Sequence, residues 1–136
     1  MSAELPAPRV VVLADDLIWA TRLGDGLRRA GGAPVPARTA AAFAAALPGA
    51  DGALVDLTAR AYDGLAALEA ASLAGVPAIA VGQHDAAPLR TAAKKAGATR
   101  VYAYRALFEH GDRELGAWLR TIDPAPTSSG TTKEDR

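Results

Sequence analysis

The sequence predicts an α/β protein built on a doubly wound parallel sheet of five strands, with helices on both faces. Residues 9–14, RVVVLA, form a continuous β-branched run of the kind found in strands that are buried on both faces. Such apolar runs alternate along the chain with segments of helical period, and crossovers of this length join parallel strands. The expected strands are 9–14, 33–38, 52–57, 76–82 and 99–105.

The segments between these runs carry helix signals. Asp15 or Asp16 can cap the first helix, Gly31–Gly32 ends it, and Thr39 and Asp85 are plausible caps further along. The second strand, APVPAR, holds two prolines and is therefore expected at an edge of the sheet. The expected helices are 15–32, 39–50, 62–75, 85–98 and 111–122.

Length and composition favour one globular domain. A chain of 136 residues can bury a hydrophobic core without disulfides or structural metal ions. Half of the residues are hydrophobic and 22% are charged. We expect a lead-in arm at 1–8, a domain at 9–122 and a disordered tail at 123–136, which is too short to fold as an effector domain. No signal sequence or membrane-spanning run is evident, which predicts a cytoplasmic protein without a membrane partner.

Several function classes are excluded by the residues that the chain contains. The chain has 15 basic residues (Lys and Arg) and 15 acidic ones (Asp and Glu). Its net charge therefore gives no reason to expect nucleic-acid binding. The absence of cysteine excludes disulfides, thiol nucleophiles and thiolate metal sites. No Ser-His-Asp set or phosphate loop can be assembled, so no enzymatic activity is expected; a small α/β nucleotide-binding or enzymatic domain stays a lesser alternative.

Acidic residues follow two of the expected strands. In a parallel α/β sheet the site lies outside the carboxyl ends of the strands. Asp15 and Asp16 come after the first strand and Asp56 lies at the end of the third, so three carboxylates should meet at one rim. The same rim would receive Gly82 from the fourth strand and Tyr104 or Arg105 from the fifth; these acids could also serve as helix caps or strand ends.

The residues VDLTARAYDGL, 55–65, together with the element order, resemble the receiver domains of bacterial two-component response regulators. Receivers carry a phospho-accepting Asp at the end of strand three and a Gly eight positions later, which Asp56 and Gly64 match. The resemblance implies a flavodoxin-like (βα)5 sheet with strand order 2-1-3-4-5. It also implies a signalling module whose partner is a histidine kinase, a downstream effector or a second copy.

The resemblance further implies a Mg²⁺ site and a contact surface. Asp15 would bind Mg²⁺ beside Asp16 or Asp56, with the carbonyl of Thr58 completing the protein ligands. Asp56 would attack the phosphoryl group. The contact surface of receivers is formed by helix four, strand five and helix five. On this face the chain carries Leu89, Tyr102, Tyr104, Leu107 and Phe108, which we expect to be exposed.

The chain departs from the receiver pattern at the residues that bind the phosphoryl group. Gly82 stands where receivers carry a Ser or Thr at the end of strand four. The receiver Lys aligns with Tyr104 without a gap; with one inserted residue, Arg105 takes that place and Tyr102 takes that of the switch aromatic. These departures favour a pseudo-receiver that acts through protein contact. A working Mg²⁺-dependent phosphoacceptor is the alternative.

Overall fold

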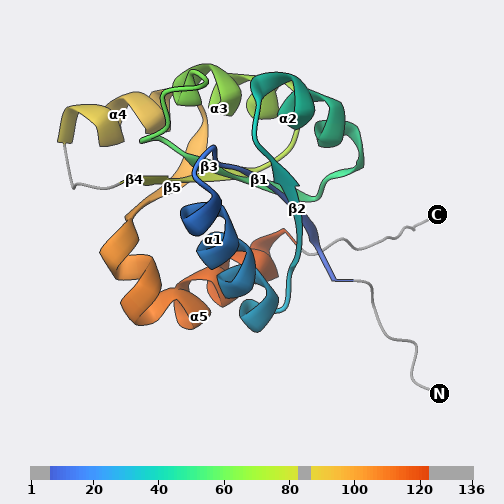
Figure 1. Ribbon diagram of the computed structural model, residues 1–136, viewed down its shortest axis with the longest axis vertical. Helices are drawn as coiled ribbons and strands as arrows, with labels where there is room; N and C mark the ends of the chain where they lie inside the picture. Colours follow the sequence, from blue (N-terminus) through green and yellow to red (C-terminus); the bar gives the residue numbers. More distant parts are fainter. Residues whose placement is uncertain (1–6, 83–86, 123–136) are drawn as a thin grey trace, which may run out of the picture.

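The computed structural model describes residues 7–82 and 87–122, in which five strands alternate with five α-helices (Figure 1). The strands are β1 (Arg9–Leu13), β2 (Ala33–Ala37), β3 (Gly52–Asp56), β4 (Ala78–Gly82) and β5 (Ala98–Ala103). The helices are α1 (Leu17–Ala30), α2 (Ala40–Ala46), α3 (Gly64–Leu73), α4 (Ala87–Lys95) and α5 (Tyr104–Thr121); a short 3₁₀ turn, Leu47–Gly49, follows α2.

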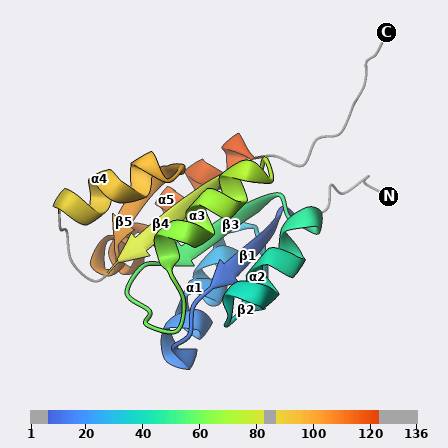
Figure 2. The same cartoon turned by 90° about the horizontal axis from the view of Figure 1, so that it is seen from above.

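All five strands are parallel, in the order β2-β1-β3-β4-β5. This confirms the predicted fold class and strand order. Helices α2, α3 and α4 cover one face of the sheet, as Figure 2 shows, while α1 and α5 cover the other. Every residue of β3 and β4 is buried, because both strands lie inside the sheet between two helical layers. The carboxyl end of β3 therefore presents Asp56 from a rigid, fully packed element.

Strand β2 lies at an edge of the sheet, as its prolines predict. The amide of Ala33 donates to the carbonyl of Pro8, and the carbonyl of Ala37 accepts from the amide of Ala14. Because hydrogen-bonding groups alternate along a strand, Pro34 and Pro36 occupy the positions that face the free edge. Proline has no N–H, so this edge offers no donor at these positions to a further strand.

Side chains cap three helices, two of them at the residues expected from the sequence, Asp16 and Thr39, and the third at Asp63. Asp16 accepts hydrogen bonds from two amides at the start of α1, and Thr39 and Asp63 cap α2 and α3 in the same way. Gly31 ends α1 with φ of 104°, a conformation that favours glycine. The expected cap at Asp85 lies outside the described residues.

The last helix differs from the prediction. Strand β5 ends at Ala103, and α5 begins directly at Tyr104, seven residues before the expected start at Gly111. His110 has non-helical dihedral angles (φ −133°, ψ 20°), so the predicted helix corresponds to the second half of a kinked one. The early start turns Tyr104 and Leu107 into the core, where each is 5% exposed. The expectation that both are exposed was therefore wrong, whereas Phe108 is 40% exposed.

Residues at both ends of the described range contact the rest of the domain. Ile122, the last described residue, is buried against the core, and Pro8 bonds to the first residue of β2. Residues 1–6 of the expected arm and the expected tail at 123–136 lie outside the described residues. Within the described part of the chain, no helix is both long enough and apolar enough to cross a bilayer.

Candidate functional site at the carboxyl rim of the sheet

Asp56 is the last residue of β3 and is 1% exposed. Among the described residues it is the only buried residue with a charged side chain. Its Oδ1 accepts hydrogen bonds from the amide of Thr58 at 2.9 Å and from the hydroxyl of Thr58 at 2.8 Å. The residue two positions downstream therefore satisfies one oxygen of the carboxylate by a local turn.

Tyr104 extends this interaction from the other side of the rim. Its hydroxyl lies 3.0 Å from the hydroxyl oxygen of Thr58. Because the Thr58 proton is directed to Asp56, the phenol is the donor, and the three groups form a chain from Tyr104 through Thr58 to Asp56. Burial raises the pKa of the Tyr104 phenol, and its interaction with Asp56 raises it further. Tyr104 thus occupies the place that the ungapped alignment gives to the receiver Lys.

Tyr62 is a site residue that the sequence reasoning missed. Its hydroxyl lies 2.9 Å from the carbonyl oxygen of Leu13 and 2.7 Å from that of Asp56, so it joins the ends of β1 and β3. Burial raises the pKa of this phenol, and the charges of Asp56 and Asp15 add to the effect. The available signal was its place directly before Asp63, in the loop that covers the rim.

The two acids after β1 have different roles. Asp16 uses its Oδ1 to cap α1, accepting from the amides of Ile18 at 2.9 Å and Trp19 at 3.1 Å. Asp15 is half-buried, and its Oδ2 accepts from the amide of Ala61 at 3.3 Å. Within the described ranges, no group of three or more His, Cys, Asp or Glu side chains is placed to hold a metal ion. Asp15 and Asp56 both lie close enough to Tyr62 for their charges to act on its phenol.

The remaining predicted site residues lie apart from this chain of hydroxyls. Arg105 projects outward, with its side chain 86% exposed, and pairs with Glu109 at 3.2 Å. Gly82 is buried at the end of β4 beside Ala103, and the residues after it lie outside the described range. Tyr102 lies half-buried on β5, with its hydroxyl 3.4 Å from a nitrogen of Arg100.

An aromatic stack connects Tyr104 to the molecular surface. Trp19 of α1 stacks on Tyr104, with ring centroids 4.1 Å apart and planes 14° apart, and on Phe108 at 5.1 Å. The guanidinium of Arg22 lies 5.5 Å from the Trp19 ring and at the same distance from Phe108. Trp19 is thus a packing residue, and it fixes the orientation of the phenol that reaches Thr58.

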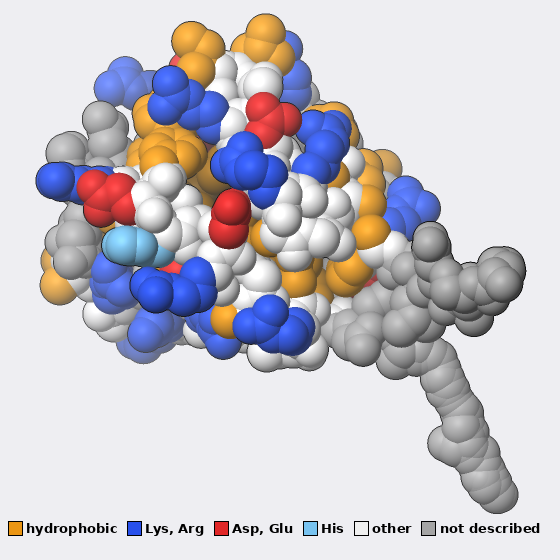
Figure 3. Space-filling model, turned by 90° about the horizontal axis from the view of Figure 1, so that it is seen from below, with side chains coloured by type: hydrophobic (Ala, Val, Ile, Leu, Met, Phe, Trp, Pro, Cys, Tyr) orange, Lys and Arg blue, Asp and Glu red, His pale blue; other side chains and the backbone are white. Residues whose placement is uncertain are grey.

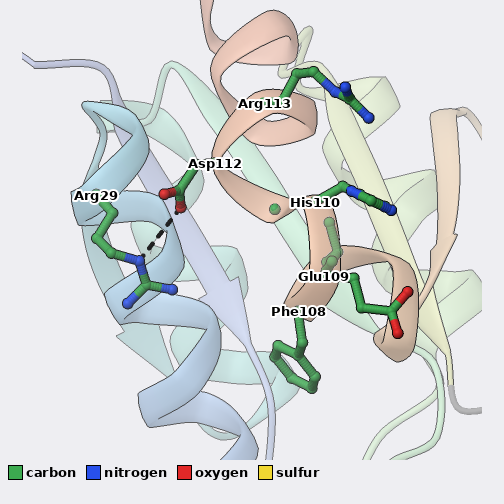
Figure 4. Close-up of a pocket in the computed structure, with 8 residues that line it drawn as sticks. Arg29, Phe108, Glu109, His110, Asp112 and Arg113 are labelled. Carbon is green, nitrogen blue, oxygen red and sulfur yellow. Dashed lines mark hydrogen bonds and ion pairs between the residues drawn. The ribbon is translucent and has the colours of Figure 1, made fainter.

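A separate cavity of about 360 Å³ lies at the kink of α5 (Figure 4). Arg29 of α1 reaches across to Asp112, with 3.3 Å between nitrogen and oxygen, while His110 and Arg113 point to the other side of the helix. None of the residues predicted for the site lines this cavity. The Arg29–Asp112 pair is exposed and therefore contributes little to stability.

Replacing Thr58 by valine is expected to lower the free energy of unfolding by about 1–3 kcal/mol, because the buried Asp56 carboxylate loses a hydroxyl donor. Replacing Asp56 by asparagine keeps its shape and removes a buried charge, so a gain of about 1–2 kcal/mol is expected near pH 7. In the Asp56→Asn background, the Thr58→Val change should cost about 0.5–1.5 kcal/mol, the value of a neutral hydrogen bond.

Urea denaturation of the four proteins in this double-mutant cycle measures the interaction. Thr121→Val is the matched control, because its hydroxyl donates to the carbonyl of Trp118 in its own helix and, among the described residues, to no charged group. If Thr58→Val costs no more than the control, or costs the same with Asp56 and with asparagine, the hydroxyl does not stabilise the charged carboxylate.

The fold of the chain is similar to that of receiver domains. It is similar to a response regulator receiver domain of Methanospirillum hungatei, with a TM-score of 0.66 and 22% identity over 85% of this chain and 98% of that one. It is similar to the receiver domain of a sensor histidine kinase of Pseudomonas aeruginosa, solved with a magnesium ion in its active-site cleft, with a TM-score of 0.71 and 18% identity over 84% and 98%.

A third similar structure is a protein of Burkholderia pseudomallei described as related to pilus assembly, with a TM-score of 0.71 and 18% identity over 90% of this chain and 94% of that one. No protein-family model and no curated protein match the sequence. At these identities the similarity shows the fold alone. Most of the structural neighbours reported are receiver domains, which confirms at the level of fold the resemblance seen in the sequence.

Proposed function

We propose that this protein is a receiver-like signalling module that acts through protein–protein contact and is not phosphorylated on Asp56. The observation that carries the proposal is the chain of hydroxyls from Tyr104 through Thr58 to Asp56. A phenol and a threonine hydroxyl stabilise the carboxylate as it stands. They supply no positive charge for a phosphoryl group, which brings further negative charge to the site.

The surroundings of Asp56 favour the same conclusion. Within the described residues Asp56 takes part in no ion pair, and Arg105, the candidate cation, is turned toward Glu109. The hydroxyl that receivers place at the end of strand four has no counterpart at Gly82. A transferred phosphoryl group would therefore meet acids and phenols rather than the groups that stabilise its charge.

A working phosphoacceptor is the second candidate, supported by Asp15 and Asp56, whose charges both act on the phenol of Tyr62. Two carboxylates and the carbonyl of Thr58 fit Mg²⁺, which accepts a few oxygen ligands and keeps several waters. Bound there, the ion would offset the charges of the acids and of an incoming phosphate. In this candidate Asp56 is the nucleophile, and Asp16 remains a cap that adds charge near the site.

We place the contact with a signalling partner, a histidine kinase or a downstream effector, on the surface formed by α4, β5 and α5. A hollow of about 420 Å³ lies there, lined by apolar parts of β5 and α5 and by charged residues from both helices. Its lining residues are Arg90, Val101, Tyr102, Ala103, Ala106, His110 and Glu114. A second copy of the chain is the other occupant that this surface suits.

We propose no nucleic-acid partner and no enzymatic activity. Figure 3 looks onto the layer of α1 and α5, where arginine side chains are interleaved with acidic ones. Ion pairs join Arg28 to Asp25, Arg29 to Asp112 and Arg105 to Glu109, so the face is not a stripe of one sign. The cytoplasmic location expected from the sequence belongs to the same proposal.

Incubation with a small phosphodonor and Mg²⁺ tests the proposal. The intact mass of the protein is expected to stay unchanged, because no basic side chain pairs with Asp56 among the described residues. Phosphorylation adds about 80 Da at a nucleophile, and its removal by the Asp56→Asn change identifies the residue. An adduct on the natural chain that is absent from Asp56→Asn would establish the phosphoacceptor function instead.

A further inference from the structure

One side of α1 forms an apolar groove with the edge strand β2. The groove has a volume of about 240 Å³ and is lined by Val12, Leu17, Ala20, Thr21, Gly24, Arg28, Pro34 and Pro36. Leu17, at the first turn of the helix, is 65% exposed, which is unusual for a large apolar side chain beside an apolar hollow. The groove and the exposed leucine lie on the same stripe of α1, because residues 17, 21, 24 and 28 repeat at helical spacing.

Gly24 is not explained by packing within the chain. A Cβ atom added there would lie 3.8 Å from the nearest atoms of Pro34, an ordinary van der Waals distance. At Gly26, on the side of α1 that meets α5, an added Cβ would lie 3.4 Å from Leu115, so packing against that side chain is tighter there. Glycine is a poor helix former, and alanine would fit at position 24. Gly24 is itself buried and lines the groove, so an added methyl group there would make the groove shallower.

The two ends of α1 carry opposite charges, which suits a second α1 that runs in the opposite direction. Asp16 is exposed at the start of the helix, and Arg28, with its side chain 65% exposed, lies near its end. An antiparallel copy brings each acid toward the arginine of the other chain and aligns the two helix dipoles favourably. The Asp25–Arg28 pair is exposed, so its exchange for a contact between chains costs little.

We propose that this groove binds a second copy of the chain, with two α1 helices packed antiparallel about a twofold axis near Thr21. Leu17 of each copy enters the groove of the other, beside Gly24 and the prolines of β2. The contact is isologous, so one surface supplies both the inserted side chain and the groove. Pro34 and Pro36 have no N–H group, so the free edge of β2 lacks a donor at these two positions. This favours the packing of a helix against the groove over the addition of a strand to the sheet. This self-association goes beyond the signalling role proposed above and occupies a different face.

Sedimentation equilibrium of the full chain at concentrations up to about 1 mM, the limit of weak association, measures the proposed dimer. The mass is expected to rise from 13.9 kDa toward twice that value. Leu17→Gln should weaken association at least about tenfold, whereas Leu73→Gln, at the 90% exposed leucine of α3, should leave it unchanged. Gly24→Ala should weaken association severalfold and raise the urea midpoint, which separates the effect from unfolding.

Charge variants test the orientation of the helices. Arg28→Glu places like charges beside the partner's acid and should weaken association at least about tenfold, whereas Arg120→Glu on α5 should not. A chain that stays monomeric up to about 1 mM overturns the proposal. It is equally overturned if Tyr102→Ser abolishes the dimer while Leu17→Gln preserves it, because the contact then uses the surface of α4, β5 and α5.

Discussion

Replacing Trp118 by alanine is expected to lower the free energy of unfolding by about 3–5 kcal/mol. Trp118 lies on α5, is 1% exposed and belongs to the core between the sheet and the layer of α1 and α5. Its removal loses the burial of the largest side chain in this core and leaves a cavity that the flanking strands cannot collapse to fill. Urea denaturation followed by circular dichroism measures the loss without relying on the tryptophan signal.

The same ring explains why the first residue of β3 is glycine. A Cβ atom at Gly52 would lie 2.6 Å from Ile122 and 2.8 Å from Trp118. Gly52→Ala is therefore expected to cost about 1–3 kcal/mol in the natural chain and less in the Trp118→Ala background, where part of the space is free. Gly49→Ala is the control, because nothing lies within 4 Å of its added Cβ. Equal costs of Gly52→Ala in both backgrounds would contradict this packing.

The elements and the rim could be predicted because their signals are local. Asp16, Thr39 and Asp63 each accept from amides two or three residues ahead, so the sequence around a cap contains the whole interaction. The apolar runs of β3 and β4 likewise indicate strands buried on both faces without further context. The presence of Asp56 at the rim followed from these elements, as did the edge position of β2.

The role of Tyr104 could not be predicted from local signals. Helix α5 starts directly after β5 with Ala103 at its cap position, and no side chain caps it, so the sequence holds no start signal there. Once the helix begins at Tyr104, its turn of about 100° per residue sends the next side chain, Arg105, to solvent. The contact of Tyr104 with Thr58 spans 46 positions and depends on the stack with Trp19, so it exists only in the folded chain.

Above about pH 10 the protein is expected to lose stability. Tyrosine ionises in the unfolded chain at this pH, whereas Tyr104 stays protonated in the folded protein, so rising pH favours the unfolded state. Burial and the nearby Asp56 raise the pKa of this phenol in the folded protein, so its contribution is complete below the unfolded pKa and is lost as the pH rises toward the folded one. The slope is up to about 1.4 kcal/mol per pH unit for one such group. Burial and the charges of Asp56 and Asp15 also raise the pKa of the Tyr62 phenol, so Tyr62 should add a slope of the same sign.

Urea denaturation of the natural chain, Tyr104→Phe and Tyr62→Phe at a series of alkaline pH values measures these slopes. Tyr104→Phe keeps the ring stacked on Trp19 and removes the titrating hydroxyl, so the loss per pH unit should fall by up to about 1.4 kcal/mol. Ultraviolet absorbance of the phenolate follows the same groups in the folded state. Tyr104→Phe with an unchanged slope, or a natural chain whose three tyrosines all ionise near pH 10 while folded, would show that the phenol is not held against Asp56.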